Sequence, residues 1–428
     1  MPEDRSQDEA RQLTVSWALS AHARRLLTLA LAGLVLSVLT RRPEFAGLAA
    51  PALLILATWR SNRPEWLRLR LRSPDRHVTE GDTVPFGVGL SGQGAYNAEV
   101  RLAPGPEIIA GPAAVIAGRD GGAKAARLQF RAERWGRRRV GTVEVILRDN
   151  ARLTEGRLDV ELPRTECSPL PARLNSSIVL SRLPSRLGEH AARAAGEGIE
   201  FSGVREFVPG DRQRRINWPA TTRRGTLHLS TFAAERTMNV VIIADSTIDV
   251  GEPGRTTLDL VQRGAAGAMA RYLAGRDRVG LIRYGSYVSW IGPGQGKRHY
   301  RRLLDLLVAG PGIGERPTGV SRLPRAALPP GALIMVFSPL LDTRLVEAVR
   351  DLRERGFSVL VMDVLNSKPR HDGSTLSNLT ARIWQLEQQA IRFSLTEIGV
   401  PVAHWDGQAS LDEPLAPYTR RAIVVQHR

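Results

Sequence analysis

Cysteine is almost absent from this chain of 428 residues, because Cys167 is the only one. A lone cysteine excludes an intramolecular disulfide and a metal cluster built on cysteine. The eight histidines are scattered without HxxxH or HxH spacing, so the sequence gives no support to a histidine metal site either. Cys167 follows a proline-containing segment, and we interpret it as a structural residue rather than a nucleophile.

Lysine is also rare, and the formal net charge of +17 is carried mostly by arginine. Such a balance favours an anionic partner: nucleic acid, an anionic membrane surface or an acidic protein. A GC-rich genome produces the same composition without selection for binding. The sequence lacks a helix-turn-helix pattern and interleaved basic and aromatic residues, and the GPGQGK segment at 292–297 lacks phosphate-loop spacing. We therefore do not expect nucleic acid as a partner.

Charge is missing from two apolar runs near the N-terminus, residues 26–40 and 45–59. Each has about 15 residues, slightly fewer than the about 20 of a full membrane span, but flanking arginines can snorkel to the interface. Residues 1–23 are polar and predict an exposed tail, and residues 24–63 predict a two-helix transmembrane hairpin. A buried helical hairpin in a soluble protein is the alternative. More arginines flank the hairpin than lie in its turn, so the positive-inside rule predicts a two-span protein of the cell membrane whose bulk is cytoplasmic.

Residues 66–163 show period-two alternation, which predicts an antiparallel β-sandwich. The expected strands begin at Leu67 and continue at 84–90, 98–102, 126–130, 138–147 and 156–162. Residues 164–197 contain three prolines and predict a linker, with a short helix at 174–182.

Residues 239–428 alternate continuous apolar runs with helical patterns, which predicts a doubly wound, mostly parallel α/β sheet. The expected strands are 239–244, 279–284, 287–291, 333–337, 358–364 and 400–404, and the expected helices are 256–274, 299–308, 345–354 and 379–398. Because ligands bind at the carboxyl ends of such strands, we expect 245–249 and 338–342 to lie together at one edge.

The densest mixture of charged, aromatic and turn residues lies in residues 198–238. The Pro-Gly-Asp turn and the many arginines predict a rigid ion-paired loop, with Trp218 as an apolar anchor on a core. A partner-recognition surface is a second interpretation, and paired-carboxylate catalysis by Glu206 and Asp211 is a third. Surrounding arginines would keep both carboxylates ionised, and no nucleophile with a base stands nearby, so catalysis is the least favoured. The residues singled out are Arg205, Glu206, Pro209, Gly210, Asp211, Arg214, Asn217, Trp218 and Arg223.

This pattern, Arg-Glu-aromatic, Pro-Gly-Asp, Arg-x-Ile-Asn-Trp and then Thr-Arg, resembles the signature of the domain of unknown function 58 family. The resemblance covers residues 198–342 specifically, and the upstream apolar hairpin and β-sandwich agree with the family's layout. It implies a von Willebrand factor A-like domain. It also implies partnership with a MoxR-type AAA+ ATPase in the assembly or maturation of client proteins.

An oxygen-rich loop follows the first α/β strand and suggests a hard cation such as Mg²⁺. The adhesion site of von Willebrand A domains has Asp-x-Ser-x-Ser, a loop Thr and a later Asp. Ser338-Pro339 stands where the later Asp is expected, so a degenerate, metal-free site is the favoured alternative. The candidate ligands are Asp245, Thr247, Asp249 and Thr318.

We therefore expect a membrane-anchored binding or scaffold protein and not an enzyme. The first alternative is a metal-dependent hydrolase using Glu206, Asp211 and Asp245. The second is an arginine-rich binder of anionic lipid or nucleic acid.

Overall fold

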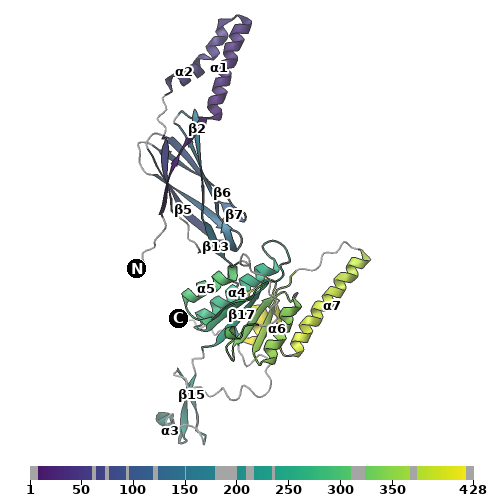
Figure 1. Ribbon diagram of the computed structural model, residues 1–428. Coiled ribbons are helices and arrows are strands. Elements are labelled where there is room, and N and C mark those ends of the chain that lie inside the picture. The colour runs from purple at the N-terminus through teal and green to yellow at the C-terminus, as the bar shows by residue number, and fades with distance from the viewer. Residues whose placement is uncertain are drawn as a thin grey trace. The chain divides into compact units, whose positions relative to one another are not determined.

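The computed structural model describes residues 8–59, 64–72, 77–92, 96–118, 124–149, 151–178, 200–208, 216–233, 237–309, 323–366 and 374–420. The chain divides into two compact units, Met1–Leu170 and Pro171–Arg428 (Figure 1).

The two large sheets of the first unit are antiparallel, as predicted, and the one parallel pair among its described strands joins β13 to β4. Two five-stranded sheets have the orders β1-β3-β5-β9-β7 and β2-β12-β11-β6-β8, and a smaller sheet has the order β10-β13-β4. Apolar residues of both large sheets share one core, in which Phe86 and Phe130 lie with ring centroids 6.1 Å apart. The strands are β3 (Trp66–Arg72), β4 (His77–Thr79), β5 (Thr83–Ser91), β6 (Tyr96–Pro104), β7 (Ile108–Ala110), β8 (Ala114–Gly118), β9 (Lys124–Ala132), β10 (Gly136–Arg139), β11 (Gly141–Arg148), β12 (Thr154–Glu161) and β13 (Arg164–Ser168).

One predicted strand, 138–147, is divided in the structure into β10 and β11. Gly141, the first residue of β11, has a φ of +129°, a conformation that residues with a Cβ rarely adopt. A Cβ added there would lie only 2.1 Å from the carbonyl oxygen of Ala103. Glycine thus permits the close backbone approach at which the chain passes from one sheet to another.

The prediction of an exposed N-terminal tail is wrong for residues 8–19. They form β1 (Asp8–Thr14), antiparallel to β3, and β2 (Ser16–Leu19), antiparallel to β12. The physical reason is the alternation of Leu13, Val15 and Trp17, which join the core of the sandwich. The Trp17 indole also donates a 2.9 Å hydrogen bond to the Pro64 carbonyl. This segment therefore contributes one strand to each large sheet.

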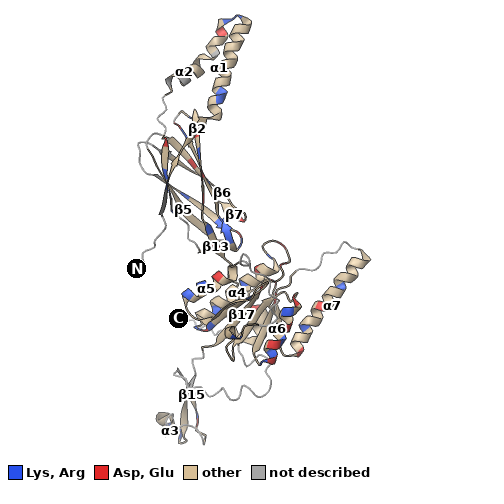
Figure 2. Cartoon of the chain, in the orientation of Figure 1, with Lys and Arg blue, Asp and Glu red and all other residues tan. Residues whose placement is uncertain are grey.

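After β2 the chain leaves the sandwich and forms a helical segment from Ala21 to Thr58, which we call the helical excursion. The 20-residue α1 (Ala21–Thr40) is the one helix of the described residues that is long and apolar enough to cross a membrane. The second apolar run forms a 3-10 turn, η1 (Pro43–Leu48), and the nine-residue α2 (Ala50–Thr58). Figure 2 shows α1 mostly without charged residues beyond its first turns. One potential span is thus present, and two full spans are not confirmed.

Both ends of the excursion attach to the same loop of the sandwich, between β11 and β12. At the start, the Ser20 hydroxyl donates a 2.6 Å hydrogen bond to the Arg152 carbonyl, and it also caps α1 by accepting from the Ala23 amide. At the return, the Trp59 indole donates a 2.6 Å hydrogen bond to the buried Asp149 carboxylate. The chain therefore departs and returns at one place.

The second unit contains a six-stranded sheet of order β19-β18-β17-β20-β21-β22. All its pairs are parallel except the β18–β19 hairpin, which agrees with the predicted mostly parallel sheet. The strands are β17 (Asn239–Asp245), β18 (Arg278–Tyr284), β19 (Ser289–Gly294), β20 (Leu333–Ser338), β21 (Ser358–Asp363) and β22 (Val402–His404). The helices are α4 (Thr257–Ala274), α5 (Lys297–Val308), α6 (Thr343–Glu354) and α7 (Thr375–Glu397). Separate apolar clusters lie on the two faces of the sheet, α4 and α5 covering one and α6 and α7 the other.

The predicted linker, 164–197, is partly ordered. Its first residues form β13 of the first unit, and the segment from Pro171 to Ile178 packs on the second unit. The predicted helix at 174–182 is wrong over 174–178, because Ser177–Ile178 forms strand β14, paired with β23 (Thr419–Arg420). The remaining linker residues lie outside the described ones. Asp412 fastens this segment by accepting hydrogen bonds from the amides of Asn175 and Ser176.

Candidate functional site

The charged signature segment forms a separate small structure. Strand β15 (Glu200–Glu206) pairs antiparallel with β16 (His228–Ala233), and the short α3 (Trp218–Arg224) lies between them in sequence. The Asn217 side chain caps α3 by accepting a 3.0 Å hydrogen bond from the Ala220 amide, and its amide group donates to the Ser230 hydroxyl. Trp218 is 63% exposed, so its predicted role as an apolar anchor is wrong.

The other signature residues lie apart or outside the described chain. Arg205 and Glu206 end β15 with exposed side chains, and the Arg205 guanidinium donates a 3.0 Å hydrogen bond to the Glu206 carbonyl. Arg223 lies in the last turn of α3. Pro209, Gly210, Asp211 and Arg214 lie outside the described residues, so the proposed pairing of Glu206 with Asp211 stays a prediction.

The carboxyl edge of the six-stranded sheet brings Asp245 and Ser338 together, as the sequence predicts for neighbouring parallel strands. Asp245 ends β17 and is 1% exposed. Its Oδ1 accepts from the Thr247 amide and hydroxyl at 3.0 and 2.6 Å, and its Oδ2 accepts from the Ser338 hydroxyl at 2.6 Å. Burial raises the pKa of Asp245, and these hydrogen bonds oppose the shift by stabilising the carboxylate.

The donor set around Asp245 does not suit Mg²⁺. This cation prefers several carboxylate, hydroxyl or water oxygens in an octahedral arrangement. Here both carboxylate oxygens already accept hydrogen bonds, and Ser338 stands in the place of a second carboxylate. Asp249 instead accepts a 3.2 Å hydrogen bond from the Leu258 amide in the first turn of α4. The fourth predicted ligand, Thr318, lies outside the described residues.

Asp342 lies near this corner but is neutralised by its neighbour. It caps α6 by accepting from the Arg344 amide at 2.9 Å, and the Arg344 guanidinium holds both carboxylate oxygens at 3.1 and 2.8 Å. Burial acts to raise the pKa of Asp342, but the hydrogen bonds and charge of Arg344 outweigh it and leave the pKa lowered. This carboxylate is therefore an ionised cap and not a proton donor at neutral pH.

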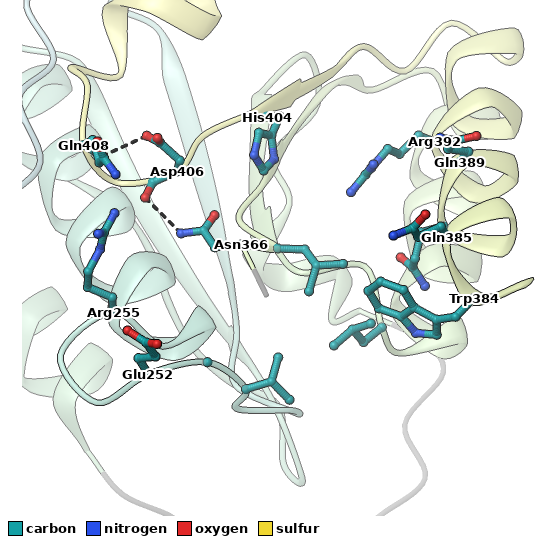
Figure 3. Close-up of a pocket in the computed structure, with 15 residues that line it drawn as sticks. Glu252, Arg255, Asn366, Trp384, Gln385, Gln389, Arg392, His404, Asp406 and Gln408 are labelled. Carbon is teal, nitrogen blue, oxygen red and sulfur yellow. Dashed lines mark hydrogen bonds between the residues drawn. The ribbon is translucent and has the colours of Figure 1, made fainter. Parts of the chain in front are cut away.

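A cavity of about 1210 Å³ lies further along the same edge, where β21 and β22 end and α7 passes. Figure 3 shows Arg392 and Gln385 reaching into it from α7, opposite His404 and Asn366. Side-chain amides are the most numerous polar groups on its wall, joined by charges of both signs and one indole. The polar lining residues are Glu252, Arg255, Asn366, Trp384, Gln385, Gln388, Gln389, Arg392, His404, Asp406 and Gln408.

A buried carboxylate, Asp363, holds the cationic side of this cavity in place. Asp363 ends β21 with 0% exposure, and its Oδ2 lies 2.6 Å from Arg392 Nη2 and 3.7 Å from His404 Nδ1. Its Oδ1 accepts a 3.0 Å hydrogen bond from the Leu365 amide. Interaction with the Asp363 carboxylate raises the pKa of His404, although desolvation opposes the shift. The cavity thus presents a guanidinium and an imidazole that are both positioned by one buried carboxylate.

Sequence reasoning missed Asp363, Arg392 and His404. The one local signal was the position of Asp363 at the end of an apolar strand, the same signal that drew attention to Asp245. Arg392 and His404 come from a helix and a strand that meet Asp363 only through tertiary packing, so no spacing in the sequence connects them.

Comparison with known proteins supports the family resemblance over part of the chain. Residues 203–378 match the family described as "Protein of unknown function DUF58". Uncharacterised proteins of Mycobacterium bovis and Mycobacterium tuberculosis are each 26% identical over 181 residues, covering 42% of this chain and 51% of the relative. The chain therefore spans about half the length of the curated relatives it matches.

Solved structures give weaker matches. Crystal structures of a β-glucosidase from Listeria innocua, in complex with glucose and with gluconolactone, match with TM-scores of 0.14 and 0.13. The sequence identities are 11% and 10%, and each match covers 23% of this chain and 16% of the other. At these TM-scores the likeness carries no argument about fold or activity.

Proposed function

We propose that this protein is a membrane-anchored, non-enzymatic binding protein that captures polypeptide segments of its partners at the cavity beside α7. The observation that carries the proposal is the chemistry of the cavity wall. Side-chain amides both donate and accept hydrogen bonds, as peptide groups do, and five of them line the cavity: Asn366, Gln385, Gln388, Gln389 and Gln408. Arginine and carboxylate groups on the same wall favour a polar, charged segment of either sign.

The carboxyl edge supports binding more than chemistry. Asp245 is buried with both oxygens hydrogen-bonded, and Asp342 is ion-paired with Arg344. Neither carboxylate is placed to activate water or to donate a proton. The hydrolase alternative that uses Asp245 therefore gains no support from this geometry.

For the partner, the family resemblance favours a MoxR-type AAA+ ATPase acting with this protein on client proteins. A von Willebrand A-like domain would use the same edge of its sheet for binding, which agrees with the location of the cavity. A photo-crosslinking amino acid at Gln389, beside the cavity, should capture the ATPase or a client. The matched control carries the same group at Val115, which is 76% exposed on β8 of the first unit. Equal capture from both positions would contradict binding at the cavity.

The way in which the helical excursion is attached supports the proposed anchor. Ser20 before α1 and Trp59 after α2 both bind the loop at Asp149–Arg152, so the flanking segments lie on one side of any membrane. A single crossing is incompatible with this arrangement, whereas a hairpin that enters and returns is compatible. We propose that the hairpin spans the membrane twice and that the two units are cytoplasmic.

Labelling of single cysteines tests this topology in intact cells. The native Cys167 is buried, and burial raises the pKa of its thiol to about 12, so it should react poorly with maleimides. Arg42→Cys, in the turn, should react with an impermeant maleimide from outside. Val115→Cys should react only after permeabilisation. Labelling of both, or of neither, before permeabilisation would contradict the two-span topology.

A further inference from the structure

Helix α7 turns an apolar stripe to solvent. Along it, Leu376, Leu379, Ile383, Leu386 and Phe393 are 78%, 53%, 57%, 57% and 66% exposed. With Ala390 they recur at alternating intervals of three and four residues, which is the spacing of positions a and d in a heptad repeat. We call these six residues the α7 seam.

The opposite face of α7 packs on its own unit. The residues of this helix that are buried are Ala381, Gln388 and Leu395, spaced seven apart. If Leu376 is position a, all three occupy position f, directly opposite the seam. Hydrogen bonds from Arg350 to Ser394 and from Arg353 to the Ile398 carbonyl, at 2.9 and 3.1 Å, further fix the end of the helix to α6. The helix is therefore held by one face while the seam points away.

The residue types in and beside the α7 seam favour a second copy of α7 as its partner. Ile383 at position a followed by Leu386 at position d is the combination that favours two-stranded parallel coiled coils. Arg382 occupies position g and Glu387 occupies the following position e, five residues later. In a parallel, in-register pair, residue g of one helix faces the following e of the other, so two opposite-charge pairs would flank the seam. An antiparallel pair would not place Arg382 against Glu387.

A lipid surface fits this helix less well. Its charged residues are Arg382, Glu387, Arg392 and Glu397, which sum to zero. Helices that lie on anionic membranes carry an excess of lysine and arginine on their polar face. Figure 2 shows the few charged residues of α7 scattered along the helix in both colours.

We propose that the α7 seam pairs with the α7 seam of a second copy in a parallel two-stranded coiled coil, making the protein a homodimer. The pairing is isologous, because the same surface of each copy forms the interface about a two-fold axis. This inference is independent of the proposed function. It also places the dimer contact on the helix whose other sides line the cavity through Gln385, Gln388 and Arg392.

Disulfide formation tests the register directly, using the full chain purified in detergent. Leu386→Cys, at position d, should give a disulfide-linked dimer under mild oxidation, because two in-register d residues meet at the axis. Gln385→Cys is the matched control, since its exposed neighbouring position c points away from the axis. We expect about tenfold faster crosslinking at 386 than at 385, and none for the wild type, whose Cys167 is buried. Equal rates at the two positions would overturn the proposal.

Charge reversal tests the pairing and its orientation. Arg382→Glu or Glu387→Arg alone should weaken dimerisation about tenfold, because two pairs become repulsive. The double variant, R382E with E387R, should restore the wild-type dissociation constant in light-scattering or sedimentation measurements. A double variant as weak as the singles would overturn the parallel arrangement.

The double substitution Ile383→Asp with Leu386→Asp separates self-association from other occupants. It should give a monomer with an unchanged circular dichroism spectrum, whereas Val115→Asp, on another exposed apolar residue, should remain a dimer. A wild-type monomer at all concentrations would overturn the proposal. So would a seam variant that stays dimeric but loses its binding to anionic vesicles or to the ATPase.

Discussion

Asp245 and Asp363 end two strands of the same parallel sheet, and both are almost fully buried, yet their surroundings differ. Asp245 is surrounded by neutral donors, the Thr247 and Ser338 hydroxyls and the Thr247 amide. Asp363 faces the Arg392 guanidinium and the His404 imidazole, which line a cavity. Asp245 is thus enclosed by hydrogen-bond donors at the edge of the sheet, whereas Asp363 positions side chains that line a cavity.

The difference lies in which elements reach each strand end. The loop after β17 folds back on its own carboxylate and then onto the first turn of α4, where Thr257 donates to the Ile248 carbonyl and accepts from the Val250 amide. The end of β21 is reached by α7 and β22, which come much later in the chain. Asp245 thus accepts hydrogen bonds from its own loop and from Ser338 at the end of the neighbouring strand, whereas a distant helix and strand give Asp363 partners that a ligand can also contact.

The largest effect should follow from removing Asp245. We expect Asp245→Ala to lower the free energy of unfolding by about 3 kcal/mol, because the buried Ser338 and Thr247 donors lose their acceptor. Urea denaturation measures this loss. Asp249→Ala, which removes a helix-terminal acceptor at a more exposed site, should cost about 1 kcal/mol. Equal losses for the two variants would contradict the prediction that the buried Asp245 contributes more to stability than the exposed Asp249.

A smaller loss of stability should follow from removing the charge of Asp363. Asp363→Asn keeps the size of the side chain but removes the charge that pairs with Arg392, and we expect a cost of about 2 kcal/mol because Arg392 can still reach water. The same substitution should lower the pKa of His404, measured by NMR titration of its ring protons. The control is Asp351→Asn, which breaks an exposed ion pair with Arg355 and should cost less than about 1 kcal/mol. An unchanged His404 pKa would show that Asp363 does not set the charge of the cavity.

The contribution of His404 to the pH dependence of stability should be smaller than either of these losses. Its pKa is raised in the folded state, so its contribution is complete below about pH 6.5, the unfolded value, and is lost as pH rises through the folded pKa. We expect the free energy of unfolding of the wild type to fall more between pH 6 and pH 8.5 than that of His404→Gln. The effect is small because the His404 side chain is 53% exposed and solvent screens it. Parallel curves for the two proteins would contradict this assignment.

Much of the fold could be predicted because its signals are local. Buried parallel strands such as Asn239–Asp245 read as unbroken apolar runs, and half-buried strands such as Trp66–Arg72 read as alternation. The N-terminal strands carried the same alternation at Leu13, Val15 and Trp17, but their charged surroundings suggested a tail. The 174–182 segment was misassigned because its strand forms only by pairing with residues near the other end of the chain, Thr419 and Arg420.

The candidate site was predictable only in part. Parallel topology brought Asp245 and Ser338 together, as expected from their places at strand ends. The hydrogen bond between the two side chains depends on a geometry that residue types alone do not specify. The cavity depended on the packing of α7 against β21 and β22, which no local pattern contains.

The smallest expected effect concerns Mg²⁺, and it tests most directly whether Asp245 binds a cation. If a cation bound Asp245 in the folded state, a hundredfold excess over its dissociation constant would stabilise the protein by about 2.7 kcal/mol. Because Ser338 supplies a neutral hydroxyl where the adhesion-site pattern has a second carboxylate, we expect Mg²⁺ or EDTA to leave the Tm unchanged. Ser338→Asp is the informative companion variant, since it removes the donor and supplies the carboxylate that the adhesion-site pattern contains. Its two neighbouring carboxylates should repel each other, and Mg²⁺ should then raise its Tm. A rise in the wild type equal to that in the variant would show that Ser338 does not replace a metal ligand.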